Sequence, residues 1–160
     1  MPDKRHDALF ADNVSIYRVA FSDGVHTEIW AHPDLGETAG AYIEKVARAM
    51  GHLPTILREP LSHVVLLEGD ETAFAEDRGR FFTIYSRNID DRISTNDLEE
   101  TLFHESVHAS LDIPFAASDL WRDAQRADAD AITVYAAQNP TREDLAESAL
   151  FAYALSLIHI

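Results

Sequence analysis

The sequence contains no cysteine, and this absence excludes several kinds of site. The chain cannot form a disulfide bond, a nucleophilic thiol, an iron–sulfur cluster held by thiolates or a zinc site built on thiolates. A metal site in this protein would therefore need histidine and carboxylate ligands.

Glycine and proline are scarce, with six of each among 160 residues, and no internal repeat or low-complexity tract divides the chain. This composition argues against fibrous and disordered proteins. The hydrophobic share of 46% and the length are sufficient for a buried core. We therefore expect one folded domain over residues 1–160.

Basic residues are few, because 13 lysines and arginines face 28 acidic residues and the formal net charge is −15. Such a charge repels phosphate backbones and anionic lipid headgroups, so neither nucleic acid nor a membrane is an expected partner. It favours cations, including metal ions and basic peptides. Solubility alone, however, explains an acidic surface equally well.

Long apolar runs are also absent. No stretch approaches the ~18 apolar residues of a membrane span, and the first residues lack a run of signal-peptide length, so we expect a cytoplasmic protein. At the other end, an apolar helical pattern continues to the last residue without a cap or a polar tail. This pattern suggests that the native C-terminus is truncated or replaced after about Leu155.

The fold class predicted from the hydrophobic patterns is α+β. Runs rich in aromatic and β-branched residues predict a small mixed or antiparallel sheet of about four strands. A short Ser-Asp-Gly turn at 22–24 predicts that the first two strands form a hairpin. The predicted strands cover 14–21, 25–31, 62–69 and 80–87.

Helical spacing of apolar residues predicts one helix within the sheet part and three after it. The sheet part is expected over about 14–87 and the helical part over about 94–158. Candidate capping residues and Pro114 suggest where the later helices begin and end. The predicted helices cover 36–51, about 94–112, 118–138 and about 139–157.

The segment "TLFHESVHASLD", residues 101–112, carries the clearest chemical signal. His104 and His108 are four residues apart, so on a helix both imidazoles can face one metal ion, and this suits zinc. Glu105 is rotated by about 100° and can act as a general base toward a metal-activated water. The alternative is a helix that carries two histidines by chance.

A third ligand is expected downstream, since a catalytic zinc usually takes three protein groups. Glu143 and Glu147 are four apart on one predicted helix, so one can bind the metal while the other holds a ligand imidazole. Asp112 continues the histidine face and could serve as an outer carboxylate or as a helix C-terminal residue. More distant acidic candidates, which we expect to be solvated, are Asp119, Asp123, Asp128 and Asp130.

The segment "HESVHASLD", followed by "NPTREDLAESALFAY", resembles the zinc-metallopeptidase domain of the anthrax lethal factor-like group, a gluzincin-type zincin. The resemblance is clearest over residues 101–155. It implies a zincin-like fold, a Zn²⁺ cofactor and a peptide or protein substrate. By position it implies His104, His108 and Glu143 as zinc ligands, Glu105 as the general base and Glu147 as the partner of a ligand imidazole.

The same group places a tyrosine near the developing oxyanion, and Tyr135 is the matching candidate here. A helical core tyrosine is the alternative for this residue, and Glu147 becomes the ligand if Glu143 faces away. The strand at 80–87 is the expected sheet edge for substrate. We treat the remaining histidines as ordinary surface or core residues: His6, His26, His32, His52, His63 and His159.

The predicted function is that of a zinc metallopeptidase that hydrolyses peptide bonds. One alternative is an inactive zinc-binding zincin-like domain that serves as an interaction module. Another is a plain α+β domain with accidental histidines.

Overall fold

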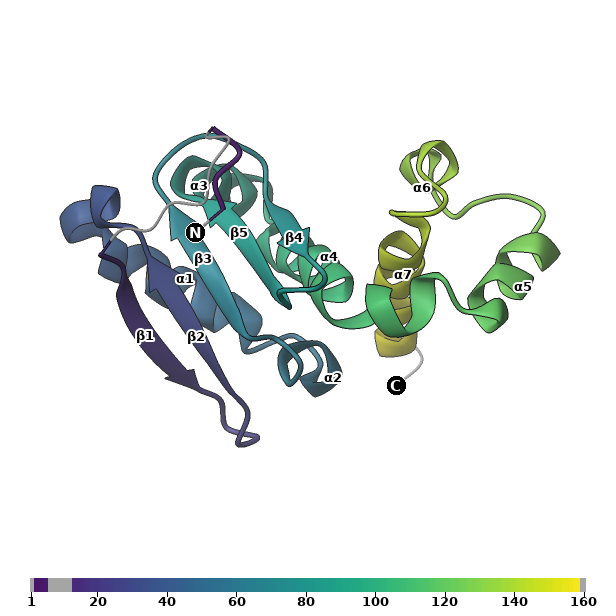
Figure 1. The fold of residues 1–160 in the computed structure, drawn as a ribbon, viewed down its shortest axis with the longest axis horizontal. Coiled ribbons are helices and arrows are strands. Elements are labelled where there is room, and N and C mark those ends of the chain that lie inside the picture. The colour runs from purple at the N-terminus through teal and green to yellow at the C-terminus, as the bar shows by residue number, and fades with distance from the viewer. Residues whose placement is uncertain (1, 6–12, 159–160) are drawn as a thin grey trace.

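A computed structural model describes residues 2–5 and 13–158 of the chain, so predictions for His6 and His159 lie outside the described residues. The fold is α+β, as predicted, and is built on a five-stranded mixed sheet with helices against one face (Figure 1). The strands follow the spatial order β1-β2-β3-β5-β4. Their bounds are β1 Ser15–Ala20, β2 His26–Ala31, β3 His63–Leu67, β4 Phe74–Glu76 and β5 Phe81–Tyr85.

Strand pairing confirms the predicted hairpin and adds a parallel centre. β1 and β2 are antiparallel, and Phe21 and Val25 close the turn between them through a backbone hydrogen bond. β2, β3 and β5 run parallel, with Val64 of β3 opposite Phe82 of β5. β4 is antiparallel to β5 and ends the sheet.

Seven α-helices occur in the described residues, joined by one 3₁₀ turn and one π-helical turn. None of these helices combines the length and the apolar character required to cross a bilayer. The helices are α1 Ala39–Met50, α2 Thr55–Arg58, α3 Ser86–Thr95, α4 Leu98–Leu111, α5 Asp119–Ala127, α6 Val134–Gln138 and α7 Asp144–Ile158, with the 3₁₀ turn at Pro33–Thr38 and the π-helical turn at Asp112–Ala116.

The main core lies between the sheet and helices α1 and α4. Alternate residues of the parallel strands point to this side, as period-two alternation requires. Helix α4 buries residues on several sides, which fixes its rotation beneath the sheet. The fully buried members of this core include Ile29, Val46, Val64, Phe82, Ile84, Leu102 and Val107.

The opposite face of the sheet carries a smaller core that the start of the chain helps to cover. Tyr85 is fully buried there, and its hydroxyl donates to Asp3 Oδ1 over 3.0 Å. The Lys4 backbone N–H donates to the same hydroxyl over 2.9 Å, and the Arg5 guanidinium forms an ion pair with Asp3. These contacts tie residues 3–5 to β5.

Substituting Asp3 by asparagine should remove an acid-sensitive part of the stability. Burial raises the pKa of Asp3, but hydrogen bonds from Arg5 and Tyr85 outweigh it and lower the pKa from 3.8 to about 2. Since the folded pKa lies below the unfolded one, this stabilisation is complete above pH 4 and is lost as the pH falls toward 2. We expect Asp3→Asn to lower the free energy of unfolding at pH 7 by roughly 1–2 kcal/mol.

Urea unfolding of parent and variant between pH 7 and pH 3 measures this effect. The difference between the two proteins should shrink as the pH falls below 4. An equal difference at all pH values would contradict the proposed role of the Asp3 charge.

The sheet edge was predicted wrongly. The strand within segment 80–87 is β5, which has β3 on one side and β4 on the other and is therefore an interior strand. The end strand near helix α4 is β4, which was not predicted because its three residues are too few to show an alternating pattern.

Two of the predicted helices also differ from the structure. The helix expected from about 94 begins at Leu98, and residues 86–95 form the unpredicted helix α3, which ends at Asn96 in the left-handed conformation. The helix expected over 118–138 is split into α5 and α6. Asp128 leaves the helical conformation with ψ at 138°, and the side chain of Thr133 caps the new helix by accepting from Ala136 N.

Candidate metal centre

Helix α4 presents His104 and His108 on one face, as the spacing of four predicts. Their Nε2 atoms lie 3.1 Å apart. The side chains are mostly buried, with 18% and 14% of their surfaces exposed. The surrounding helix is held by the core, so the two imidazoles have a fixed support.

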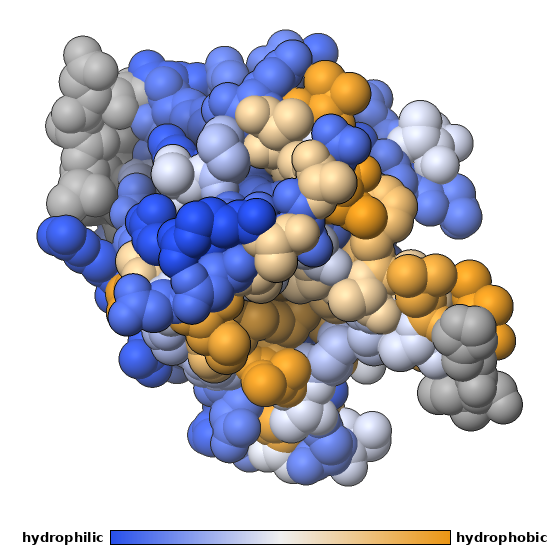
Figure 2. Space-filling view, turned by 90° about the vertical axis from the view of Figure 1, so that its right-hand side faces the viewer, coloured by the Kyte–Doolittle hydropathy of each residue, from blue (hydrophilic) through white to orange (hydrophobic). Residues whose placement is uncertain are grey.

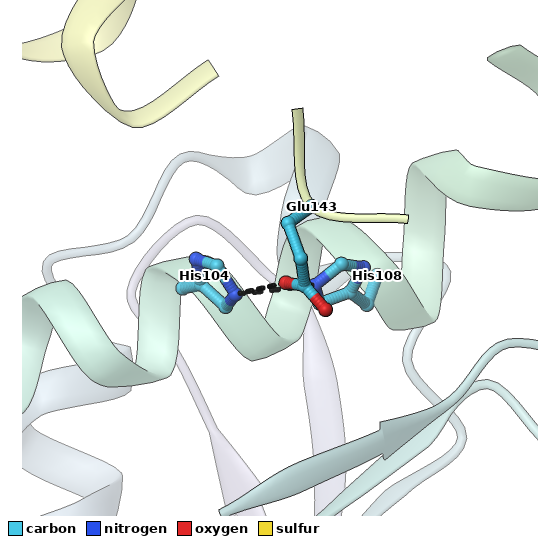
Figure 3. A group of neighbouring side chains, drawn as sticks. All are labelled: His104, His108 and Glu143. Atoms are coloured by element: carbon cyan, nitrogen blue, oxygen red, sulfur yellow. Dashed lines mark hydrogen bonds and ion pairs between the residues drawn. The ribbon is translucent and has the colours of Figure 1, made fainter. Parts of the chain in front are cut away.

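Glu143 meets both imidazoles from a different part of the chain (Figure 3). Its Oε2 atom lies 3.2 Å from His104 Nε2 and 3.1 Å from His108 Nε2. The residue stands immediately before α7 rather than within it, in a turn where its N–H donates to Asn139 O. Phe103 and Tyr153 stack at 5.2 Å and help to hold α7 against α4.

The outer nitrogen of each imidazole also faces a carboxylate. His104 Nδ1 lies 3.3 Å from Glu147 Oε1, so Glu147 is at the position expected for an imidazole partner. His108 Nδ1 lies 2.7 Å from Asp112 Oδ2, one turn further along the same chain segment. Asp112 is also the C-terminal cap residue of α4, so its position is compatible with both roles left open for it.

These contacts favour one tautomer of each neutral imidazole. A carboxylate facing Nδ1 favours the tautomer that keeps the proton there, which leaves the lone pair on Nε2. With both rings neutral in this tautomer, His104 Nε2, His108 Nε2 and Glu143 Oε2 would be three acceptors within about 3 Å of one another, with no donor among them. Such a cluster is unfavourable without a cation between its members.

The spacing fits a zinc ion. Bonds of ~2.0–2.1 Å in a tetrahedral arrangement separate the ligand atoms by about 3.3 Å, close to the distances of 3.1–3.2 Å between these three atoms. Within the described part of the chain, this is the one group of three or more such side chains with metal-binding spacing. The distant acidic candidates Asp119, Asp123, Asp128 and Asp130 do not belong to it.

Burial sets the electrostatics of the centre. It raises the pKa of Glu105 to about 7, and the charge of Glu143 acts in the same direction, while His108 and Lys4 act against it. Burial and the neighbouring His108 lower the pKa of His104. For His108, burial is outweighed by Asp112 and Glu143, so its pKa is raised.

A cleft of about 1270 Å³ contains all of these groups, with β4 along one wall and the segment from α6 to α7 along another. Tyr135 lines the cleft and is half exposed, so it is not the core tyrosine that was its alternative. Burial and the negative charge of Glu143 raise its pKa. Figure 2 shows this end of the molecule, where strongly hydrophilic side chains lie beside an apolar area.

The sequence interpretation did not identify two features of this cleft. The β4 wall is too short to be recognised from its pattern, and two cleft arginines, Arg122 and Arg142, carry no motif.

Comparisons with models of known protein families, with curated proteins and with solved structures find no match.

Proposed function

We propose that this protein is a zincin-like zinc metallopeptidase. The observation that carries the proposal is the triangle of His104 Nε2, His108 Nε2 and Glu143 Oε2, whose lone pairs converge at spacings suited to zinc. A partly buried carboxyl group, Glu105, belongs to the same cleft. Together these groups supply a cation site and a base, which is the combination that metal-assisted hydrolysis requires.

Each side chain then has a distinct task. Zinc held by the three ligands would polarise the scissile carbonyl and make water a stronger nucleophile at neutral pH. Glu105 accepts the proton of the attacking water and delivers it to the leaving amine. Tyr135 hydrogen-bonds to the oxygen that becomes negative as the carbonyl is attacked. Glu147 and Asp112 keep the imidazoles oriented.

The substrate is proposed to be a peptide that binds in extended form along β4. This strand ends the sheet and lines the cleft that contains Glu105. A peptide added to such an edge gains main-chain hydrogen bonds while its side chains reach the neighbouring walls. The geometry therefore suits a polypeptide better than a compact small molecule.

Zinc content and zinc-dependent cleavage test the proposal. We expect one zinc per chain after mild purification, cleavage of a peptide library, loss of cleavage with a chelator, and recovery when zinc is returned. Mass spectrometry of the library and elemental analysis of the protein provide the two measurements.

The alternatives give different results. Bound zinc without cleavage would replace the peptidase by the inactive zinc-binding module. Absence of both zinc binding and cleavage would leave an α+β domain without this function.

A further inference from the structure

Arg122 and Arg142 line the cleft on the side of Glu143, and both are exposed. Neither guanidinium has an ion pair or a hydrogen bond with any residue that the structure describes. Two other arginines nearby are paired, Arg92 with Asp97 in the same cleft and Arg126 with Asp123 on α5, whereas Arg78, which follows β4, also lines the cleft without a side-chain partner in the described residues. Arg122 and Arg142 are therefore two guanidinium groups without a partner in the described residues, and both belong to the wall that carries Glu143.

A single glutamine holds the two arginines on the same wall. Gln125 lies almost one turn after Arg122, and its Nε2 donates to Pro140 O and to Asp144 Oδ2, both over 2.8 Å. These two acceptors are on either side of Arg142 in the sequence. Helix α5 is thus fastened to the segment that carries Arg142.

The same contacts explain why Arg142 lacks a partner. Its neighbour Glu143 faces the two imidazoles, and the buried carboxylate of Asp144 accepts from Gln125. Both adjacent carboxylates are therefore already engaged. A guanidinium offers five donors in a planar fork that matches a carboxylate, so an external carboxylate is the natural partner.

We propose that Arg122 and Arg142 form a subsite that binds a carboxylate of the peptide substrate, either an acidic side chain or the C-terminal carboxylate. The inference rests on the proposed peptidase function, because Arg142 adjoins the ligand Glu143 and so places the bound carboxylate near the scissile bond. It replaces the expectation from net charge that basic peptides are favoured. The local arginines of this wall, rather than the total charge, set the preference.

Binding to zinc-loaded Glu105→Gln protein tests the subsite without cleavage. Three fluorescent peptides of one sequence are compared by anisotropy: one with an internal Glu and an amidated end, one with Gln and an amidated end, and one with Gln and a free carboxylate. We expect at least one carboxylate peptide to bind about tenfold more tightly than the neutral peptide. The peptide that shows the preference identifies the source of the carboxylate, and either source supports the proposal.

The preference should disappear in Arg122→Gln and in Arg142→Gln, with zinc content measured for each. Arg18→Gln is the matched control, since Arg18 is an exposed arginine on β1 outside the cleft, and it should retain the preference. Equal binding of all three peptides, a preference that survives the double variant, or equal loss in Arg18→Gln would overturn the subsite. Failure of the peptidase proposal is distinct, because it appears as absence of cleavage by the parent whether or not carboxylate peptides bind preferentially.

Discussion

Replacing Glu105 by glutamine should lower the rate of peptide cleavage by about 10²–10⁴-fold and leave zinc binding unchanged. The substitution keeps the size and polarity of the side chain but removes its ability to accept a proton. Glu105 is not among the atoms that converge on the cation site, so the ligand triangle stays intact. The loss should therefore appear in the chemical step rather than in metal content.

Rates on one library-derived peptide, with zinc determined on the same samples, measure this effect. Glu99→Gln provides a matched control, because Glu99 lies on the same helix, is exposed and does not line the cleft. Its cleavage rate should equal that of the parent. A Glu105→Gln protein that retains zinc and cleaves as fast as the parent would remove Glu105 from the mechanism.

The sheet shows how far local patterns predict this fold. The hairpin of β1 and β2, the strand β3 and the helix α1 each follow from a run long enough to display its period. β5 passes directly into α3 at Ser86 without a loop, so the strand pattern over 80–87 hides the start of that helix. Which strand lies at the edge depends on pairing with β4, and pairing is not contained in the pattern of one strand.

The prediction of the helical part is wrong for a different reason. Residues 118–138 have enough helical character to suggest one long helix, but Asp128 and the capping side chain of Thr133 break it. Asp and Thr side chains compete for backbone hydrogen bonds and favour such breaks. The break moves Tyr135 onto a short helix beside the cleft instead of into the core.

In the candidate site too, local spacing predicts some residues, whereas others depend on tertiary contacts. The contacts of His104 with Glu147 and of His108 with Asp112 depend on side chains that face one another across a turn or between two helices. Spacings of four residues indicate which side chains share a face, so these residues could be chosen from the sequence. The Arg122–Arg142 wall depends on the tertiary contacts of Gln125, which no spacing reveals.

Removing the carboxylate of Glu143 should have the largest effect on metal binding. Glu143→Ala deletes the one atom that lies within 3.2 Å of both Nε2 nitrogens, so we expect zinc affinity to fall by about 10³-fold. Glu147→Gln and Asp112→Asn leave all three ligands in place and change only the partner of an imidazole, so each should weaken binding about 10–100-fold. Competition with a chromophoric chelator at fixed pH ranks the variants.

The order of these affinities decides between the two glutamates. If Glu147 were the ligand, Glu147→Gln would lose more zinc than Glu143→Ala, which would reverse the expected order. Glu99→Gln, measured in the same way, should match the parent, and circular dichroism of each metal-free variant separates lost ligation from lost folding. Equal small losses in all variants would mean that the convergence of the three side chains does not create a zinc site.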